Sequence, residues 1–174
     1  MIGPARPRVH EAETGANGKG ADPMAIKDIL VHVDLSPASE GRLAAAVALA
    51  EASEARITAL GLIAEPLLRA MPSRHLPADV VREYVLQAER DLDAVLAAAT
   101  ERARERGVLL AHRREVGSLD RLPHLLGLQG RHADLVVVGQ PNPETGGADA
   151  ALLAEAAFMD TGRPALVVPY AAGP

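Results

Sequence analysis

The sequence predicts an α/β protein with an open, parallel, five-stranded sheet of order 3-2-1-4-5 and helices on both faces. Short aliphatic runs alternate with longer amphipathic segments along the chain, which indicates strands that alternate with helices. Residues 134–139, DLVVVG, form an uninterrupted apolar run, as expected of a central parallel strand that is covered on both faces. Alternating strands and helices joined by right-handed crossovers give such a sheet.

The chain divides into a tail, residues 1–23, and a single domain, residues 24–174. The tail is rich in Gly, Pro, Ala and charged residues, so we expect it to be disordered. It holds no apolar run that could act as a signal sequence or a membrane span, and we expect a cytoplasmic protein without a membrane partner.

Composition excludes several functional classes. The chain has no Cys, which rules out disulfides, a thiolate nucleophile and Cys-ligated metals. It has 18 Lys and Arg against 23 Asp and Glu, a net charge of -5, and only 2% aromatic residues. Neither the charge nor the scarce aromatic residues favour binding to nucleic acid.

The first half of the domain predicts two strands and two helices. Residues 26–34 form a buried strand, and Ser36 and Pro37 then serve as the cap and the first position of a helix over residues 37–53. A second strand follows at residues 56–63, and residues 64–77 connect it to a long helix over residues 78–106 that ends at Gly107. The inward-facing residues of these helices recur at helical spacing: Leu43, Val47 and Ala50 in the first, and Val81, Val85, Ala88, Leu92, Val95 and Ala99 in the second.

The second half predicts three more strands. Residues 108–116 are a more polar strand near an edge of the sheet, and Asp120 is the expected N-cap of a short helix, residues 121–129, with Pro123 in its first turn. The central strand 134–139 comes next, then a helix over residues 148–160. The last strand begins at Ala165 and ends at Pro169, which has no N–H to donate to a sheet.

The strand order predicts where a ligand would bind. In open parallel sheets, ligands occupy the crevice at the C-terminal strand ends where the strand order reverses. Here that crevice lies between the first and fourth strands, so Asp34 and Gly139 are the candidate residues at its mouth.

Three segments resemble the universal stress protein family: KDILVHVDLSPASE, ADLVVVG and GRPALVVP. They occur in the family's order and spacing, and the resemblance covers residues 24–170. It implies a Rossmann-like fold, a homodimer that pairs through the last strand at residues 165–169, and, in one branch of the family, ATP held in the crevice. Leu62 resembles the position whose backbone meets adenine in the members that bind ATP, although an aliphatic residue there is also ordinary core.

The resemblance to the ATP-binding branch is incomplete. That branch carries Gly, two residues, Gly, nine residues, then Gly with Ser or Thr, and of these positions Gly139 matches. Asn142 stands at the second glycine, between Pro141 and Pro143, which lack the N–H that a phosphate would use. Counted back from the last strand, the final Gly-Ser pair falls on residues 151 and 152, Ala151 and Leu152.

Two further glycines keep nucleotide binding open. Gly146 and Gly147 could form a replacement anion site before the fourth helix, because glycine permits a close approach of the backbone. Glu144 and Asp149 add negative charge beside them.

The expected function is that of a cytoplasmic, dimeric binding or regulatory module of the stress response, with unidentified protein partners and without tight ATP binding. The alternative is an adenine-nucleotide binder or slow ATPase that uses Asp34, Leu62, Gly139, Gly146 and Gly147. A small-molecule enzyme ranks third, because Ser36 and Ser118 have no neighbouring His base. His32 and His112 lie on strands without an organised carboxylate set, so no metal is assigned.

Overall fold

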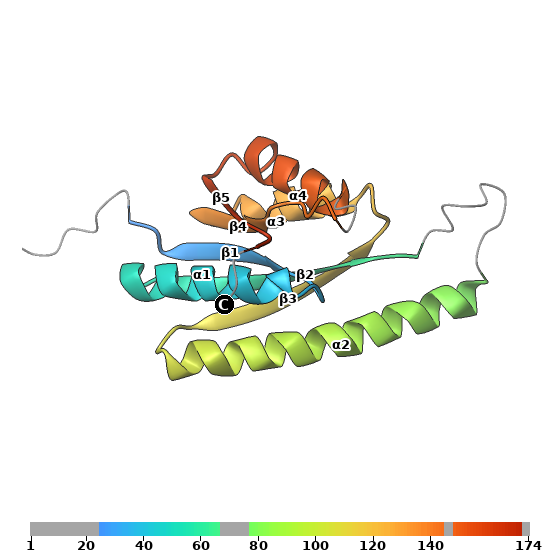
Figure 1. Cartoon of the computed structure of the whole chain (residues 1–174), viewed down its shortest axis with the longest axis horizontal. Coiled ribbons are helices and arrows are strands. Elements are labelled where there is room, and N and C mark those ends of the chain that lie inside the picture. The colour runs from blue at the N-terminus through green and yellow to red at the C-terminus, as the bar shows by residue number, and fades with distance from the viewer. Residues whose placement is uncertain (1–24, 67–76, 145–147, 172–174) are drawn as a thin grey trace, which may run out of the picture.

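The computed structural model describes residues 25–66, 77–144 and 148–171, in which five strands alternate with four helices (Figure 1). The elements are β1 (Asp28–Val33), α1 (Ala38–Ser53), β2 (Arg56–Ala64), α2 (Ala78–Glu105), β3 (Leu110–Gly117), α3 (Leu122–Gly130), β4 (Leu135–Gly139), α4 (Ala148–Met159) and β5 (Ala165–Val168). The predicted tail and most of the predicted 64–77 connection lie outside the described residues, as do Gly146 and Gly147.

The five strands form one sheet of order β3-β2-β1-β4-β5, and every pair is parallel, which confirms the predicted topology. β1 lies in the middle, where Ile29 pairs with Ile57 of β2 and with Leu135 of β4. Helices α1 and α2 cover one face, and α3 and α4 cover the other (Figure 1). The C-terminal ends of β1 and β4 are therefore neighbours, as the crevice requires.

Alternating side chains of each strand build two apolar layers. On β1, Ile29, Val31 and Val33 pack under α1 and α2, while Leu30 packs under α3 and α4. β4 is buried over its whole length, which agrees with its uninterrupted apolar sequence. Leu43, Val47 and Ala50 of α1 are buried as predicted.

Several element ends differ from the prediction. Pro37 is the N-cap of α1, and the Ser36 side chain makes no capping bond because its hydroxyl donates to Asp34 instead. Arg121 rather than Asp120 is the N-cap of α3, again without a side-chain cap. The end of α2, by contrast, agrees with the prediction. Gly107 follows the C-cap residue Arg106 and adopts a left-handed conformation (φ 73°), which favours glycine.

The first half of α2 extends beyond the sheet, which corrects the predicted inward stripe. Val81 and Val85 are only half-buried, and the buried residues of α2 begin at Leu92. Leu92 packs closely on Gly61 of β2, where an added Cβ would lie 2.3 Å from its Cδ2 atom. Glycine at position 61 therefore lets α2 lie close to the sheet. No helix in the described ranges combines the length and the hydropathy needed to cross a membrane.

Because the first half of α2 extends beyond the sheet, we expect the two halves of this helix to contribute unequally to stability. Leu92 is 1% exposed and Leu86, on the same helix, is 43% exposed. We expect Leu92→Ala to lower the free energy of unfolding by about 2–5 kcal/mol, because it leaves a cavity under α2. The matched control Leu86→Ala should change it by less than about 0.5 kcal/mol. Denaturant unfolding measures both values, and equal losses would show that the first half of α2 is packed as tightly as the second.

Candidate functional site

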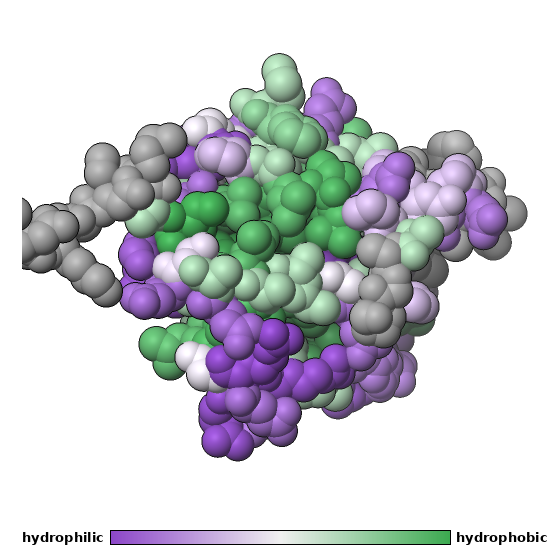
Figure 2. Space-filling model, turned by 60° about the vertical axis from the view of Figure 1, so that its left-hand side comes forward, coloured by the Kyte–Doolittle hydropathy of each residue, from purple (hydrophilic) through white to green (hydrophobic). Residues whose placement is uncertain are grey.

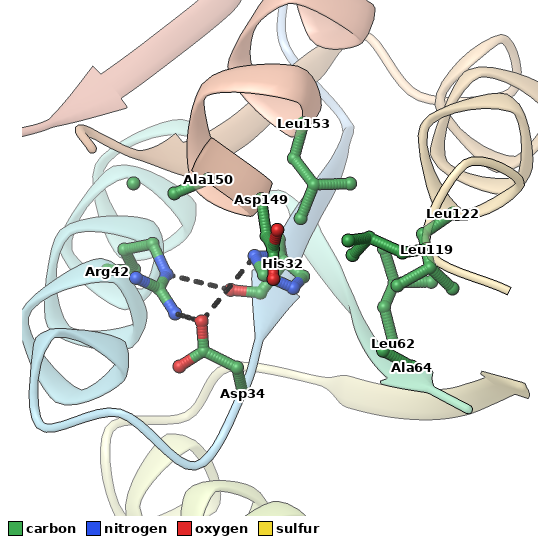
Figure 3. A pocket seen from close by; sticks show the side chains of 11 residues that line it. His32, Asp34, Arg42, Leu62, Ala64, Leu119, Leu122, Asp149, Ala150 and Leu153 are labelled. Carbon is green, nitrogen blue, oxygen red and sulfur yellow. Dashed lines mark hydrogen bonds and ion pairs between the residues drawn. The ribbon is translucent and has the colours of Figure 1, made fainter. Parts of the chain in front are cut away.

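A pocket of about 200 Å³ lies at the C-terminal end of the sheet, where the strand order reverses. One wall is polar and is formed by His32, Asp34, Arg42 and Asp149 (Figure 3). The opposite wall is aliphatic and comprises Leu62, Ala64, Leu119, Leu122 and Leu153. The structure thus brings together three of the predicted site residues, Asp34, Leu62 and Gly139, in one pocket.

Arg42 is the residue that prediction missed. It lies on the buried face of α1 and is only 4% exposed, although arginine is rarely buried unless it is paired. Its Nε atom donates to the backbone carbonyl of His32 at 3.0 Å. Its Nη2 atom lies 2.7 Å from Oδ2 of Asp34, an ion pair that does not meet the geometry of a hydrogen bond, and Nη2 has no other hydrogen-bond partner among the described residues.

Asp34 directly follows β1 and uses both of its carboxylate oxygens. Oδ1 accepts hydrogen bonds from the backbone N–H and the hydroxyl of Ser36, and Oδ2 pairs with Arg42. Burial favours the neutral acid, but the Arg42 guanidinium and the Ser36 hydrogen bonds outweigh burial and hold the pKa of Asp34 below its usual value. Asp34 is therefore a carboxylate at neutral pH, and it also braces the turn at Ser36.

His32 lies at the back of the pocket and is buried on the α3–α4 side of the sheet. Its Nδ1 atom is 3.9 Å from Oδ2 of Asp34. Burial is the main reason that the pKa of His32 falls from 6.5 to about 4; Asp34 opposes the change and Arg42 favours it. The imidazole is therefore neutral at physiological pH. The buried His32 differs in this respect from His112, which is exposed on β3.

Gly139, the last residue of β4, is in contact with Arg42. A Cβ at this position would lie 2.6 Å from Nη1 of Arg42, closer than Cβ atoms approach their neighbours. The side chain of Arg42 thus lies directly over the backbone of β4. Only glycine leaves room for the guanidinium in this position.

The beginning of α4 faces the pocket differently from what the motif spacing suggested. Asp149, Ala150 and Leu153 line the pocket, whereas Ala151 and Leu152 do not line it and are exposed. The absence of a hydroxyl at position 152 is therefore not what shapes the pocket wall.

The loop after β4 contains an internal hydrogen bond. The side-chain oxygen of Asn142, between Pro141 and Pro143, accepts the backbone N–H of Glu144 at 2.9 Å. That N–H is thus already in use within the loop. In the described part of the chain, no group of three or more His, Asp and Glu side chains is placed to hold a metal ion.

A weak signal for Arg42 was present in the sequence. Arg42 is four residues before Ala46 and three after Ser39, and all three are buried on the same face of α1. Arg42 also follows Asp34 by eight residues, close enough along the chain for the two side chains to meet at the start of the helix.

The buried histidine makes the stability of the protein depend on pH. Because the folded pKa of His32 is about 4 and the unfolded value about 6.5, the unfolded chain binds more protons between these values, and stability is lost as the pH falls below 6.5. We expect the free energy of unfolding to fall by about 2 kcal/mol between pH 7 and pH 5. His32→Gln should remove this loss.

Denaturant unfolding at the two pH values measures the effect, with the exposed His112 as the matched control. His112→Gln should retain the full loss. An unchanged pH dependence in His32→Gln would show that the imidazole is not the group that titrates.

Most of the domain matches a known protein family. The model of the universal stress protein family matches residues 25–155. A search of the curated proteins found no match.

Solved structures with the same fold cover most of the chain. A universal stress family protein from Burkholderia pseudomallei is 26% identical, with a TM-score of 0.56 over 84% of this chain and 98% of that one. The universal stress protein UspA from Lactobacillus plantarum is 20% identical, with a TM-score of 0.65 over 82% and 97%. A universal stress protein in complex with cAMP is 23% identical, with a TM-score of 0.53 over 84% and 99%. The match of the family model to most of the domain shows that this chain belongs to the universal stress protein family.

Proposed function

We propose that this protein is a non-catalytic binding or regulatory module of the stress response, which acts as a cytoplasmic homodimer with protein partners and without a tightly bound adenine nucleotide. The observation that carries the proposal is the ion pair in the crevice between the buried Arg42 and the partly exposed Asp34. In this crevice a nucleotide would need the space and the carboxylate that Arg42 already uses.

The part of the crevice beside Asp34, where the base of a nucleotide would bind, supports the proposal because protein side chains already occupy it. Asp34 is the candidate residue at the mouth of the crevice that a nucleoside would contact, yet both of its carboxylate oxygens are engaged by Ser36 and Arg42. The remaining pocket of about 200 Å³ is smaller than the roughly 300–1,000 Å³ typical of pockets for organic ligands.

The loop after β4 and the start of α4, where the phosphates would bind, support the proposal because they offer few donors and add negative charge. Pro141 and Pro143 have no N–H, and the N–H of Glu144 is bonded within the loop. The carboxylate of Asp149 lines the pocket, where it would lie near a bound phosphate. Both features weaken an anion site.

The competing proposal is an adenine-nucleotide binder or slow ATPase. The observation in its favour is that three similar solved structures are complexes with cAMP, AMP and dAMP. In this alternative, Gly146 and Gly147 supply the phosphate contacts and Arg42 moves when the ligand enters.

A titration of the wild-type protein decides between the two proposals. A ligand at 100 times its dissociation constant stabilises a protein by about 2.7 kcal/mol, which is several degrees in melting temperature for a chain of this size. We expect millimolar Mg-ATP or AMP to produce no such shift. A saturable calorimetric signal at micromolar nucleotide, or ATP released from the purified protein on denaturation, would establish the nucleotide binder.

The edge of the sheet at β5 supports the dimer. Among the described residues β5 pairs with β4 on one side only, and Ala165, Leu166 and Val167 are half-buried in this single chain. Figure 2 shows an apolar area at the level of β5 that continues over α1. At the end of α4, Phe158 and Met159 are exposed, Met159 to 75%. An unpaired apolar edge invites association, and a twofold pairing of β5 would cover it.

A charge on this edge should separate the subunits. We expect the wild type to be a dimer at micromolar concentration and Val167→Asp to shift it toward monomer, because the carboxylate would be buried in the interface. Leu109→Asp is the matched control, since Leu109 is an exposed aliphatic residue beside β3 at the other edge. Light scattering measures the mass. A monomeric wild type, or a stable dimer of Val167→Asp, would rule out β5 as the interface.

A further inference from the structure

We infer that Arg42 is the residue that closes the crevice to purine nucleosides, so that its side chain acts as a built-in plug and its removal opens a nucleoside site. This inference rests on the proposed function and names the group responsible for it. We call the guanidinium of Arg42, which lies between Asp34, His32 and Gly139, the plug (Figure 3).

The plug is held by one hydrogen bond, one ion pair and one close contact. Nε donates to the carbonyl of His32, Nη2 pairs with Asp34, and Nη1 lies against the backbone of Gly139. These groups come from β1 and β4, the two strands between which the crevice opens. A charged group this deeply buried is stable only while its partners remain, so the plug has no low-energy alternative within the crevice.

A nucleoside would have to break these contacts. To take the place of the guanidinium at Oδ2 of Asp34 it must displace Arg42, which leaves a buried guanidinium without its counter-charge. To approach the end of β4 it must displace Nη1 from Gly139. The ligand therefore gains a hydrogen bond only by creating an unpaired charge, and wild-type affinity should be low.

Replacement of Arg42 by a small neutral residue reverses this balance. Oδ2 of Asp34 becomes a free acceptor, and the backbone at Gly139 becomes accessible. The aliphatic wall of Leu62, Leu119 and Leu153 is already present on the other side, and it suits the flat, largely apolar face of a purine.

Only the half of the crevice that would hold the base is opened by this change. Pro141 and Pro143 still provide no N–H to a phosphate, and Asp149 still lines the pocket. Adenosine, AMP and ATP should therefore bind the opened protein with similar affinities. This flat dependence on phosphate number separates an opened base site from an ordinary nucleotide site.

Isothermal titration calorimetry of the full chain with adenosine tests the inference. We expect Arg42→Ala to bind adenosine at least about tenfold more tightly than the wild type. Arg42→Met, which keeps an apolar stem in the crevice but removes the charge, should lie between the two. The matched control is Arg102→Ala, which removes an exposed arginine paired with Glu40 and should bind like the wild type. Circular dichroism and thermal unfolding verify that each variant is folded.

The outcomes separate failure of this inference from failure of the proposed function. If the wild type binds nucleotide at micromolar concentration, the proposed function is wrong and the plug is wrong with it. If the wild type does not bind, and folded Arg42→Ala and Arg42→Met do not bind either, only the plug is refuted. Tighter binding of ATP than of adenosine by the variants would also refute it, as would the failure of both variants to fold, because Arg42 would then be a structural core residue.

Discussion

The buried charge of Arg42 is the constraint on which the rest of the crevice depends. A guanidinium away from water is costly unless its donors and its charge find partners, and the neighbouring elements supply them. Asp34 provides the counter-charge, the carbonyl of His32 accepts from Nε, and Gly139 leaves the space. The acidic strand end and the glycine that mark a ligand site in a parallel sheet here serve a side chain of the protein itself.

The sheet topology explains why these groups meet. Because β1 and β4 are adjacent and parallel, Asp34 and Gly139 reach the same edge of the sheet from opposite halves of the chain. α1 follows β1 directly and places Arg42 above this edge. The connection through α1 that follows β1 thus also carries the side chain that fills the crevice. The crevice is occupied because the residue at position 42 of this helix is an arginine.

Patterns of apolar residues were sufficient to predict the strands, their order and the position of the crevice. These patterns do not indicate how wide the sheet is. Val81 and Val85 continue the helical spacing of Leu92, yet they lie on the part of α2 that extends past the sheet. Strand order likewise identified Asp34 and Gly139 as residues of the crevice, because it depends on backbone topology alone. The roles of Leu62, Gly146 and Gly147 toward a nucleotide stay predictions.

Arg42 was not predicted because arginine is normally a surface residue, and the pattern of α1 was interpreted from its aliphatic side chains only. Its burial depends on His32 and Asp34 at the end of β1 and on Gly139 at the end of β4, and the aliphatic pattern of α1 alone does not reveal these partners. The direction of the α4 side chains was similarly beyond motif spacing: Asp149 and Leu153 face the pocket, while Leu152 does not. Positions on a helix are set by its rotation against the sheet.

A crystal structure of the protein purified without added nucleotide is the most direct test of this account. We expect density for the Arg42 side chain within the crevice, with Nη2 paired to Asp34 and Nη1 against Gly139, and no nucleotide between β1 and β4. Density for an adenine nucleotide beside Asp34, with the Arg42 side chain turned out of the crevice, would contradict it.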